Sequence, residues 1–335
     1  MEVSQCAPQE AFRDLERAFR NWRAGRAGRP RFKRKKSLDD HKARLTGSIR
    51  VSPRHVPLPR IGRIHTQERM EKLLALLQEK KARILSATIS READRWFVSL
   101  TCEVERPDPV PREGEPVGVD LGLMFFLVLS DGTRIEAPKP LAKALRRLCC
   151  LSRQLSRKQK GSRNDAKTSL RLARWHRRIR NLRRDGLPPV PTGRAKTQPV
   201  LVVEALNVRG MVRGRLARSI ADVGWGMFLR FLAYKAQWYG ATLIIAPSDF
   251  PSTRRCSGCG WVEPKVPLSV RVFRCARCGL EIDRDLNAAW NLKPYGLTVL
   301  NGPTGSSMGR WGPHAIHRIA WGPRWPVVIG AAAER

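Results

Sequence analysis

The sequence predicts an α/β protein, and three observations point to this fold class. Short apolar runs, typical of buried strands, occur at residues 117–121, 125–129, 200–204 and 241–247. Residues 139–184 and 216–239 between these runs carry apolar side chains at helical spacing. Two Cys-x2-Cys motifs within residues 256–278 indicate an inserted metal-binding unit. Strands that alternate with helices favour a mixed sheet covered by helices.

The N-terminal part is expected to contain helices and a hairpin. In residues 9–25, large apolar side chains recur at spacings of three and four and predict an amphipathic helix: Phe12, Leu15, Phe19 and Trp22. A shorter helix is expected over 68–80, and residues 83–104 alternate like a β-hairpin. The proline-bearing segment 107–116 predicts a linker, so we place a domain boundary there.

The net charge predicts a polyanionic partner. Lys and Arg number 64 and Asp and Glu 29, a formal net charge of +35. This excess excludes an acidic ligand-buffer protein and argues against an enzyme for small neutral substrates, so nucleic acid is the expected partner. Residues 29–36 (RPRFKRKK) form either a solvated loop or a phosphate-contacting arm, and the overall charge favours the arm.

The second part of the chain opens with three expected strands, at 117–121, 125–129 and near 134–136, with a turn at Asp131-Gly132. Residues 139–184 then hold 17 Lys or Arg and one acid, Asp165. Two apolar stripes, broken at Gly161-Ser162, predict a helical hairpin: Leu141, Leu145, Leu148 and Leu155 in one, Leu172, Trp175, Ile179 and Leu182 in the other. Sixteen net positive charges in 46 residues repel one another unless a polyanion neutralises them, which favours nucleic-acid contact.

The remaining elements lead to the cysteine cluster and beyond it. Residues 186–199 contain four prolines and are not expected to form regular helix. A strand at 200–204, one long helix over 216–239 and a strand at 241–247 follow, with Gly240 as a helix cap. A short helix is expected from about Asp285, and the Gly- and Pro-rich residues 296–335 are expected to be disordered.

No apolar run approaches the roughly 18–20 residues that a membrane span needs, and residues 1–10 do not have the order of a secretory signal. We therefore expect a cytoplasmic protein without membrane contact, in which paired cysteines are metal ligands rather than disulfides. Cys256-x2-Cys259 and Cys275-x2-Cys278, with 15 residues between them, match a four-thiolate structural Zn²⁺ site. Four thiolates leave no open position, which excludes a catalytic zinc here.

Three acids stand where a buried charge needs a partner. Asp120 lies in VGVDLG and Glu204 ends VLVVE, and the third acid is Asp283 or Asp285, where a helix would begin after the cysteines. A buried carboxylate costs several kcal/mol unless it is paired or bound to metal. Three convergent carboxylates can hold two Mg²⁺ ions for phosphodiester hydrolysis. The alternative is that each acid pairs with an arginine for structural reasons.

Six motifs together are specific for a known family: GVDLG (118–122), DGT (131–133), VVEALNVRGM (202–211), SIADVGWGMFLRFLAYKAQWYG (219–240), PSTRRCSGCG (251–260) and DRDLNAAWNL (283–292). Over residues 10–295 the sequence resembles the TnpB-type (insertion-sequence OrfB) transposase family. These are transposon-encoded RNA-guided nucleases related to type V CRISPR effectors. The resemblance implies involvement in DNA transposition and recombination, and RNA-guided cleavage of double-stranded DNA.

The resemblance also implies roles for particular residues. Asp120, Glu204 and Asp285 would be the catalytic acids that bind Mg²⁺, with Asp283 as second choice to Asp285. The four cysteines 256, 259, 275 and 278 would bind structural zinc. The implied partners are DNA and a guide RNA from the transposon end, and the hairpin 139–184 would contact the guide–target heteroduplex. The sequence does not indicate an oligomeric state.

The resemblance further implies an RNase H-like (RuvC-type) mixed sheet and a division of the chain. Residues 1–106 would be an N-terminal helical and partial β-barrel region, residues 117–248 the RuvC-like nuclease domain, residues 249–281 the zinc ribbon, residues 282–295 the final motif and helix, and residues 296–335 a disordered tail. Family members usually begin with some tens of residues more, so we expect a truncated barrel.

Two local differences from the family bear on activity. Residues 186–199 are normally helical in the family, and Ala205 replaces an acidic residue. One hypothesis is therefore a two-Mg²⁺ endonuclease, and the alternative is a catalytically inactive DNA- or RNA-binding relic or repressor-like derivative. A third hypothesis is a basic RNA-associated zinc-ribbon protein, but this hypothesis does not explain the spaced acids.

Overall fold

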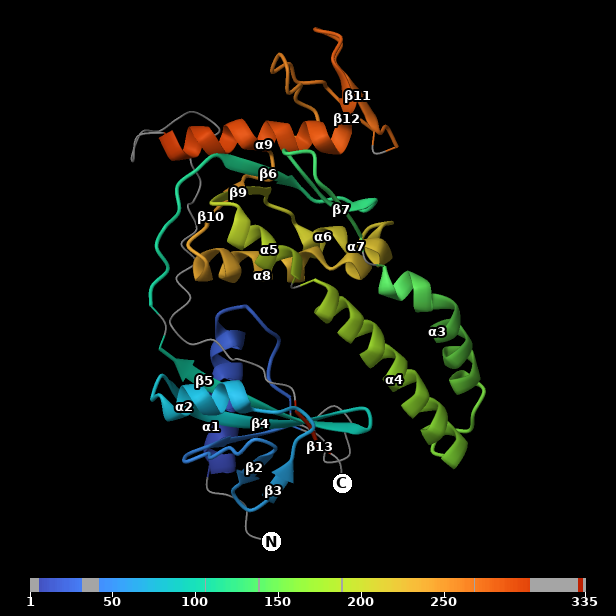
Figure 1. Cartoon of the computed structure of the whole chain (residues 1–335). Helices are drawn as coiled ribbons and strands as arrows, with labels where there is room; N and C mark the ends of the chain where they lie inside the picture. The colour runs from blue at the N-terminus through green and yellow to red at the C-terminus, as the bar shows by residue number, and fades with distance from the viewer. Residues whose placement is uncertain are drawn as a thin grey trace. The chain divides into compact units, whose positions relative to one another are not determined.

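The computed structural model describes residues 6–31, 42–105, 107–137, 139–187, 189–267, 269–301 and 331–333 (Figure 1). The chain separates into two compact units, residues 1–107 with 321–335, and residues 108–320. Helices and strands alternate in a mixed α/β fold, as the sequence predicts. Among the described residues, no helix is both long enough and apolar enough to cross a lipid bilayer.

The first unit is built on an antiparallel sheet with the order β1-β4-β5-β13. Its elements are α1 (Cys6–Arg23), β1 (Lys42–Thr46), β2 (His55–Leu58), β3 (Gly62–His65), α2 (Glu71–Gln78), β4 (Ala82–Glu92), β5 (Arg95–Val104) and β13 (Ala331–Ala333). The predicted hairpin is β4 and β5, with Glu92 opposite Arg95. The apolar stripe predicted for the first helix does not enter the core of this unit, since Phe12 is 72% exposed and Leu15 48%.

The second unit contains a five-stranded sheet, a basic helical hairpin and a small cysteine-bearing ribbon. Its elements are β6 (Pro116–Asp120), β7 (Phe125–Leu129), β8 (Arg134–Glu136), α3 (Pro140–Ser156), α4 (Arg163–Gly186), α5 (Pro189–Thr197), β9 (Val200–Glu204), α6 (Val208–Met211), α7 (Ala217–Val223), α8 (Trp225–Trp238), β10 (Thr242–Ala246), β11 (Val272–Arg274), β12 (Glu281–Asp283) and α9 (Arg284–Asn301).

The five strands follow the order β10-β9-β6-β7-β8. β10, β9 and β6 are parallel, whereas β7 and β8 continue the sheet in antiparallel pairs. α9 covers one face of the sheet, and α5 and α8 lie on the other side (Figure 1). Because both faces of β9 are covered, its sequence is a continuous apolar run rather than an alternating one.

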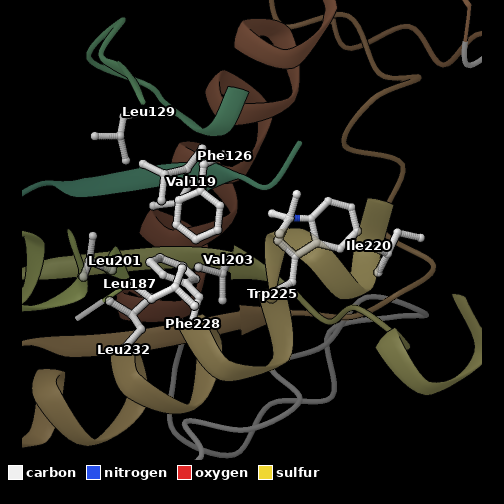
Figure 2. Close-up of a cluster of buried hydrophobic side chains, with 12 residues drawn as sticks. Val119, Phe126, Leu129, Leu187, Leu201, Val203, Ile220, Trp225, Phe228 and Leu232 are labelled. Atoms are coloured by element: carbon white, nitrogen blue, oxygen red, sulfur yellow. The ribbon is translucent and has the colours of Figure 1, made fainter. Parts of the chain in front are cut away.

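One face of the sheet packs on α8 through a large apolar core. The buried side chains of this core are Val119, Phe126, Leu127, Leu129, Leu187, Leu201, Val203, Ile220, Val223, Trp225, Phe228 and Leu232 (Figure 2). Phe126 of β7 meets Phe228 of α8 edge to face, with 4.9 Å between the ring centroids. Each large side chain buried here contributes about 1.5–3 kcal/mol to holding helix and sheet together.

The opposite face packs on α9, and there the two backbones approach closely. A methyl group on Gly118 would lie 2.0 Å from the carbonyl oxygen of Ala289 in α9, so β6 needs glycine at this point. Val202 of β9 packs beneath the same helix. Side chains alternate along a strand, so Asp120 shares the α9 face with Gly118. For the same reason Glu204 shares that face with Val202.

The predicted basic hairpin is formed by α3 and α4. Its two helices pack through Ala144, Leu148 and Ile179, with Leu141, Leu172 and Trp175 around them. The Ser162 hydroxyl accepts the N–H of Asp165 at 3.1 Å and so caps the start of α4. Leu182, which the apolar spacing places in this contact, is 51% exposed instead.

A buried carboxylate holds the hairpin to the rest of its unit. Asp222 of α7 is 3% exposed and accepts the N–H groups of Leu141 (2.8 Å) and Ala142 (2.9 Å) at the start of α3. Arg183 of α4 donates to this carboxylate at 3.2 Å and to the Asp222 carbonyl oxygen at 2.8 Å. One side chain therefore caps the first helix of the hairpin and pairs with the second.

Replacing Asp222 by Ala should lower the free energy of unfolding of this unit by about 3 kcal/mol, because two helix N–H groups and a partly buried guanidinium lose their acceptor. Urea unfolding of Asp222→Ala measures this loss. Asp185→Ala, which changes an exposed carboxylate near the end of α4, is the matched control. An equal, small effect of both substitutions would show that other contacts attach the hairpin.

Three predicted segments differ from the structure. Residues 189–197 form α5 although irregular structure was expected. Pro189 and Pro191 lie in its first turn, where the missing N–H removes no helical hydrogen bond. The single helix expected over 216–239 is two helices, because Gly224 adopts φ 78° and separates α7 from α8.

The third difference concerns the expected tail. α9 continues to Asn301, so residues 296–301 are helical and not disordered. Residues 331–333 form β13, which pairs with β5. The remainder of the predicted tail, residues 302–330 and 334–335, lies outside the described residues, as does most of the basic run at 29–36.

Candidate active site and metal centre

Two acidic residues end neighbouring parallel strands. β6 and β9 pair in register from Pro116 with Val200 to Val119 with Val203, so the next residues, Asp120 and Glu204, stand opposite each other. The carboxyl ends of parallel strands meet at one edge of the sheet, where α/β proteins place their sites. Since both side chains also face α9, the sheet brings the first two predicted acids together.

The third predicted acid, Asp285, lies in the first turn of α9 and is 7% exposed. A methyl group on Gly122, two residues beyond Asp120, would lie 3.6 Å from Oδ2 of Asp285. The Asp285 carboxylate therefore sits beside the segment that follows Asp120. Asp120 and Glu204 therefore face α9, and Asp285 lies in the first turn of that helix.

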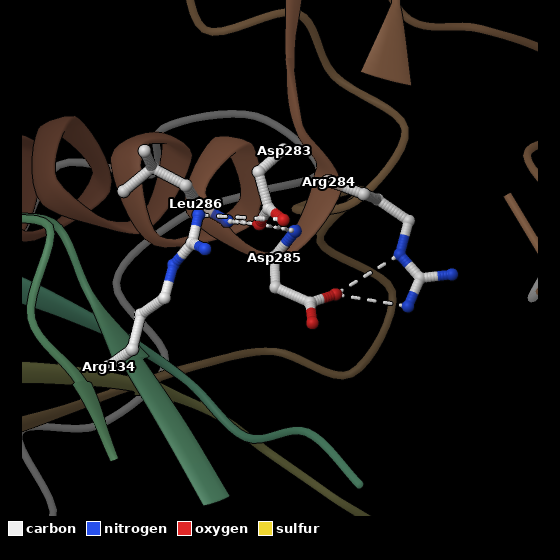
Figure 3. Close-up of polar contacts among 5 residues, drawn as sticks. All are labelled: Arg134, Asp283, Arg284, Asp285 and Leu286. Atoms are coloured by element: carbon white, nitrogen blue, oxygen red, sulfur yellow. Dashed lines mark hydrogen bonds and ion pairs between the residues drawn. The ribbon is translucent and has the colours of Figure 1, made fainter. Parts of the chain in front are cut away.

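Asp283 has a structural role in this arrangement (Figure 3). Its Oδ1 accepts the N–H groups of Asp285 (3.1 Å) and Leu286 (3.0 Å), which caps the start of α9. Its Oδ2 lies 3.6 Å from the Arg134 guanidinium. These contacts support Asp285 rather than Asp283 as the third acid of the site.

Asp120 is affected by the charges of both other acids. Burial raises the pKa of Asp120 to about 8, and the negative charges of Asp285 and Glu204 contribute to the shift, while the Arg284 guanidinium opposes it. Burial also raises the pKa of Glu204, and a hydrogen bond from Ser252 opposes that shift. Carboxyl groups whose charges are mutually unfavourable are what a bound cation would stabilise.

The carboxylate oxygens of the three acids do not lie as close together as the ligands of one metal ion. Arg284 donates to Oδ1 of Asp285, with Nη2 at 3.0 Å, and both side chains are nearly buried. In the described ranges, the four cysteines are the one group of metal-ligand side chains whose donor atoms all lie within 4.8 Å of one another. The arginine-pairing alternative thus holds for Asp285 in this structure, and a cation would have to compete with Arg284.

The four predicted zinc ligands do come together. The Sγ atoms of Cys256 and Cys278 are 3.6 Å apart, and those of Cys259 and Cys275 are 3.5 Å apart. Each Cys-x2-Cys motif turns through the glycine that follows it, Gly260 and Gly279, at φ 75° and φ 72°. In both turns the glycine N–H donates to the carbonyl oxygen of the first cysteine at 3.0 Å. Two equivalent thiol turns around one point suit a tetrahedral ion.

Polar side chains of α9 join the cysteine ribbon to the acid site. Asn287 accepts the N–H of Ser257 at 3.0 Å and donates to the Arg255 carbonyl oxygen at 2.7 Å. Asn291 donates to the carbonyl oxygens of Ser252 (2.8 Å) and Arg255 (2.6 Å). The loop that enters the ribbon is therefore tied to the helix that carries Asp285.

Sequence reasoning missed these two asparagines, as well as Ser252 and Asp222. The signal for the asparagines was present, since two amides four residues apart in the apolar segment LNAAWNL share one helix face. Both are buried, and a buried amide needs hydrogen-bond partners. Ser252 and Asp222 carry no comparable pattern, because their partners lie far away in the sequence.

Comparison with known proteins agrees with this architecture. The family OrfB_IS605, described as "Probable transposase", matches residues 99–215, and "Cas12f1-like, TNB domain" matches residues 225–292. A "Putative RNA-guided DNA endonuclease" of Streptomyces pristinaespiralis is 37% identical over 300 residues, which cover 89% of this chain and 73% of that protein. The chain belongs to the TnpB (OrfB) family.

Further relatives span a similar share of their own lengths. InsQ of Escherichia coli, named with the same activity, is 32% identical over 308 residues that cover 87% of this TnpB-family chain and 74% of InsQ. A solved structure titled as a Cas12f1-sgRNA-target DNA complex has a TM-score of 0.54 at 12% identity, over 84% of this chain and 69% of that one. At this identity the likeness concerns the fold alone.

Proposed function

We propose that this TnpB-family chain is an RNA-guided DNA endonuclease of transposons, with a RuvC-type nuclease centre at Asp120, Glu204 and Asp285. The observation that best supports this proposal is that the three acids lie on one side of the sheet. Burial raises the pKa of Asp120 to about 8 there, and the charges of Asp285 and Glu204 add to the shift. Two bound Mg²⁺ ions would supply an activated water and stabilise the departing oxygen of the phosphodiester.

The residues of the chain hold and organise that centre. Asp120 and Glu204 sit on rigid parallel strands, and Asp285 sits on a helix start that Asp283 caps. The Arg284 guanidinium pairs with the Asp285 carboxylate, so a cation that binds Asp285 would have to replace this contact. The rigid supports suit ions that demand near-ideal octahedral ligand geometry.

The rest of the second unit supports nucleic-acid binding. The basic hairpin, α3 and α4, carries most of the 17 Lys and Arg and is attached to α7 by Asp222, which suits contact with the backbone of a guide–target duplex. The cysteine cluster would hold a structural Zn²⁺. The relatives named as putative RNA-guided DNA endonucleases support DNA and RNA as partners, and we propose that the guide RNA comes from the transposon end.

Cleavage of plasmid DNA by the purified protein with its transposon-end RNA tests the proposal. We expect Mg²⁺-dependent, RNA-dependent cleavage that is lost in Glu204→Gln, while RNA binding remains. Exposed Glu136 of the same sheet provides the matched control, Glu136→Gln.

Binding without cleavage would instead support the inactive relic or repressor-like derivative. In that case a plot of log K for duplex DNA against log salt concentration should have a slope of about −0.9 per neutralised phosphate. Substitution of the three acids should not change the affinity.

A further inference from the structure

Ser252 is a buried polar residue that the proposed chemistry does not use. It lies in the loop after β10, is 2% exposed, and its hydroxyl donates to Oε2 of Glu204 at 2.8 Å. The chain reaches this point by a turn in which Phe250 N–H donates to the Pro247 carbonyl oxygen and Ser252 N–H to that of Phe250. A buried hydroxyl aimed at one carboxylate oxygen restricts that carboxylate to one orientation.

The hydroxyl is itself held in place from α9. The amide of Asn291, 5% exposed, donates to the Ser252 carbonyl oxygen at 2.8 Å. Phe250, two residues earlier, packs against Tyr295 of the same helix with 5.0 Å between ring centroids. Both contacts come from the helix that carries Asp285. Ser252 therefore connects the acid at the end of β9 with the helix that presents the third acid.

We propose that Ser252 is a positioning residue that holds Oε2 of Glu204 and leaves Oε1 directed to a divalent cation. This inference rests on the proposed function, because it assumes that Glu204 is a cation ligand. Without the hydroxyl, the carboxylate can rotate about its terminal torsion, and the cation must order it on binding. Hydrogen-bond partners of metal ligands typically contribute 10–100-fold to metal affinity or activity.

The chain offers a matched control a few residues away. The Oγ of Ser257 is buried and has no hydrogen-bond partner among the described residues. Its backbone N–H, which Asn287 accepts, is kept when the side chain changes. Ser257→Ala therefore removes a hydroxyl from the neighbouring turn, between Cys256 and Cys259, without removing a hydrogen bond, whereas Ser252→Ala removes the contact to Glu204.

The experiment measures the Mg²⁺ concentration at half of the Mg²⁺-induced rise in melting temperature, and the concentration at half-maximal DNA cleavage. For Ser252→Ala we expect both midpoints to rise about tenfold. Ser252→Thr, which keeps the hydroxyl, should stay within about twofold of the wild type, as should Ser257→Ala.

Each outcome decides between the proposals. An unchanged midpoint in Ser252→Ala, or equal midpoints for the Ala and Thr variants, would overturn the positioning role. If Mg²⁺ raises the melting temperature of the wild type but the protein does not cleave DNA, only the proposed function is contradicted. The Mg²⁺ midpoints of the melting temperature, compared between wild type and the Ser252 variants, would still test the positioning role. A wild type that Mg²⁺ does not stabilise would overturn the inference, because Glu204 would then bind no cation.

Discussion

Asp120→Asn should abolish Mg²⁺-dependent DNA cleavage and, at the same time, raise the melting temperature of the metal-free protein at pH 8. Asp120 is half-buried, and loss of solvent raises the pKa of its carboxyl from the ordinary value of 3.8 to about 8. Asparagine keeps the shape but carries no charge, so it avoids the cost of a buried anion. It also lacks the negative charge that a cation needs, which is why stability and activity should change in opposite directions.

The raised pKa of Asp120 determines how the stability of the protein changes with pH. Between about pH 4 and 8 the unfolded carboxyl loses its proton while the folded one keeps it, so unfolding releases a proton and stability falls as pH rises. One such group contributes a slope of at most about 1.4 kcal/mol per pH unit. The melting-temperature difference between Asp120→Asn and wild type should therefore grow from pH 5 to pH 8.

Melting curves in a chelator at several pH values measure this difference. Asp131→Asn is the control, because Asp131 is exposed and Asn can still accept the N–H of Thr133 that Oδ1 accepts now. It should change neither cleavage nor the pH slope. Addition of Mg²⁺ should stabilise the wild type more at pH 8 than at pH 6, and Asp120→Asn little at either. Equal pH slopes for Asp120→Asn and wild type would show that Asp120 does not keep its proton in the folded state.

The strands and the cysteine cluster near the acids were largely predictable, because each is indicated by a pattern within a short stretch of sequence. β9 is buried on both faces, so its five residues show an uninterrupted apolar run that ends in the acid. The cysteine spacing is also local, and it predicted the cluster that forms. The positions of Asp120 and Glu204 at strand ends then follow from strand direction, which places both at one edge.

The contacts that support the site could not be predicted from the sequence, because they join residues that are far apart in it. Ser252 reaches Glu204, and Asp222 reaches the start of α3, across long stretches of chain. The proline content of residues 186–199 led to the wrong prediction that they form no regular helix. A count of prolines ignores that the N–H groups of the first helical turn need no partner within the helix, so prolines are tolerated at the start of α5. The break at Gly224 is a matter of backbone conformation, since a glycine inside an apolar periodic segment is compatible with a continuous helix until its φ is known.

Removing zinc should abolish cleavage even though no cysteine belongs to the acid site. Thiolate coordination of a structural Zn²⁺ contributes on the order of 10–16 kcal/mol to local folding, far more than the small core of the ribbon around Phe273 can replace. Without the ion, residues 256–282 should unfold. Ser257 N–H and the Arg255 carbonyl oxygen would then leave Asn287, and the loop that carries Ser252 would lose part of its attachment to α9.

A zinc-selective chelator in excess Mg²⁺ separates the two metals, and re-added Zn²⁺ should restore cleavage. Hydrogen exchange should rise in residues 250–290 and stay unchanged in β4 and β5 of the other unit. Cys275→Ser should behave like zinc removal, whereas Cys150→Ser, at an exposed position of α3, should behave like wild type. Cleavage that survives unfolding of the ribbon would show that β6, β9 and the start of α9 hold the three acids without it. The Asn287 and Asn291 contacts would then serve to orient the ribbon rather than to support catalysis.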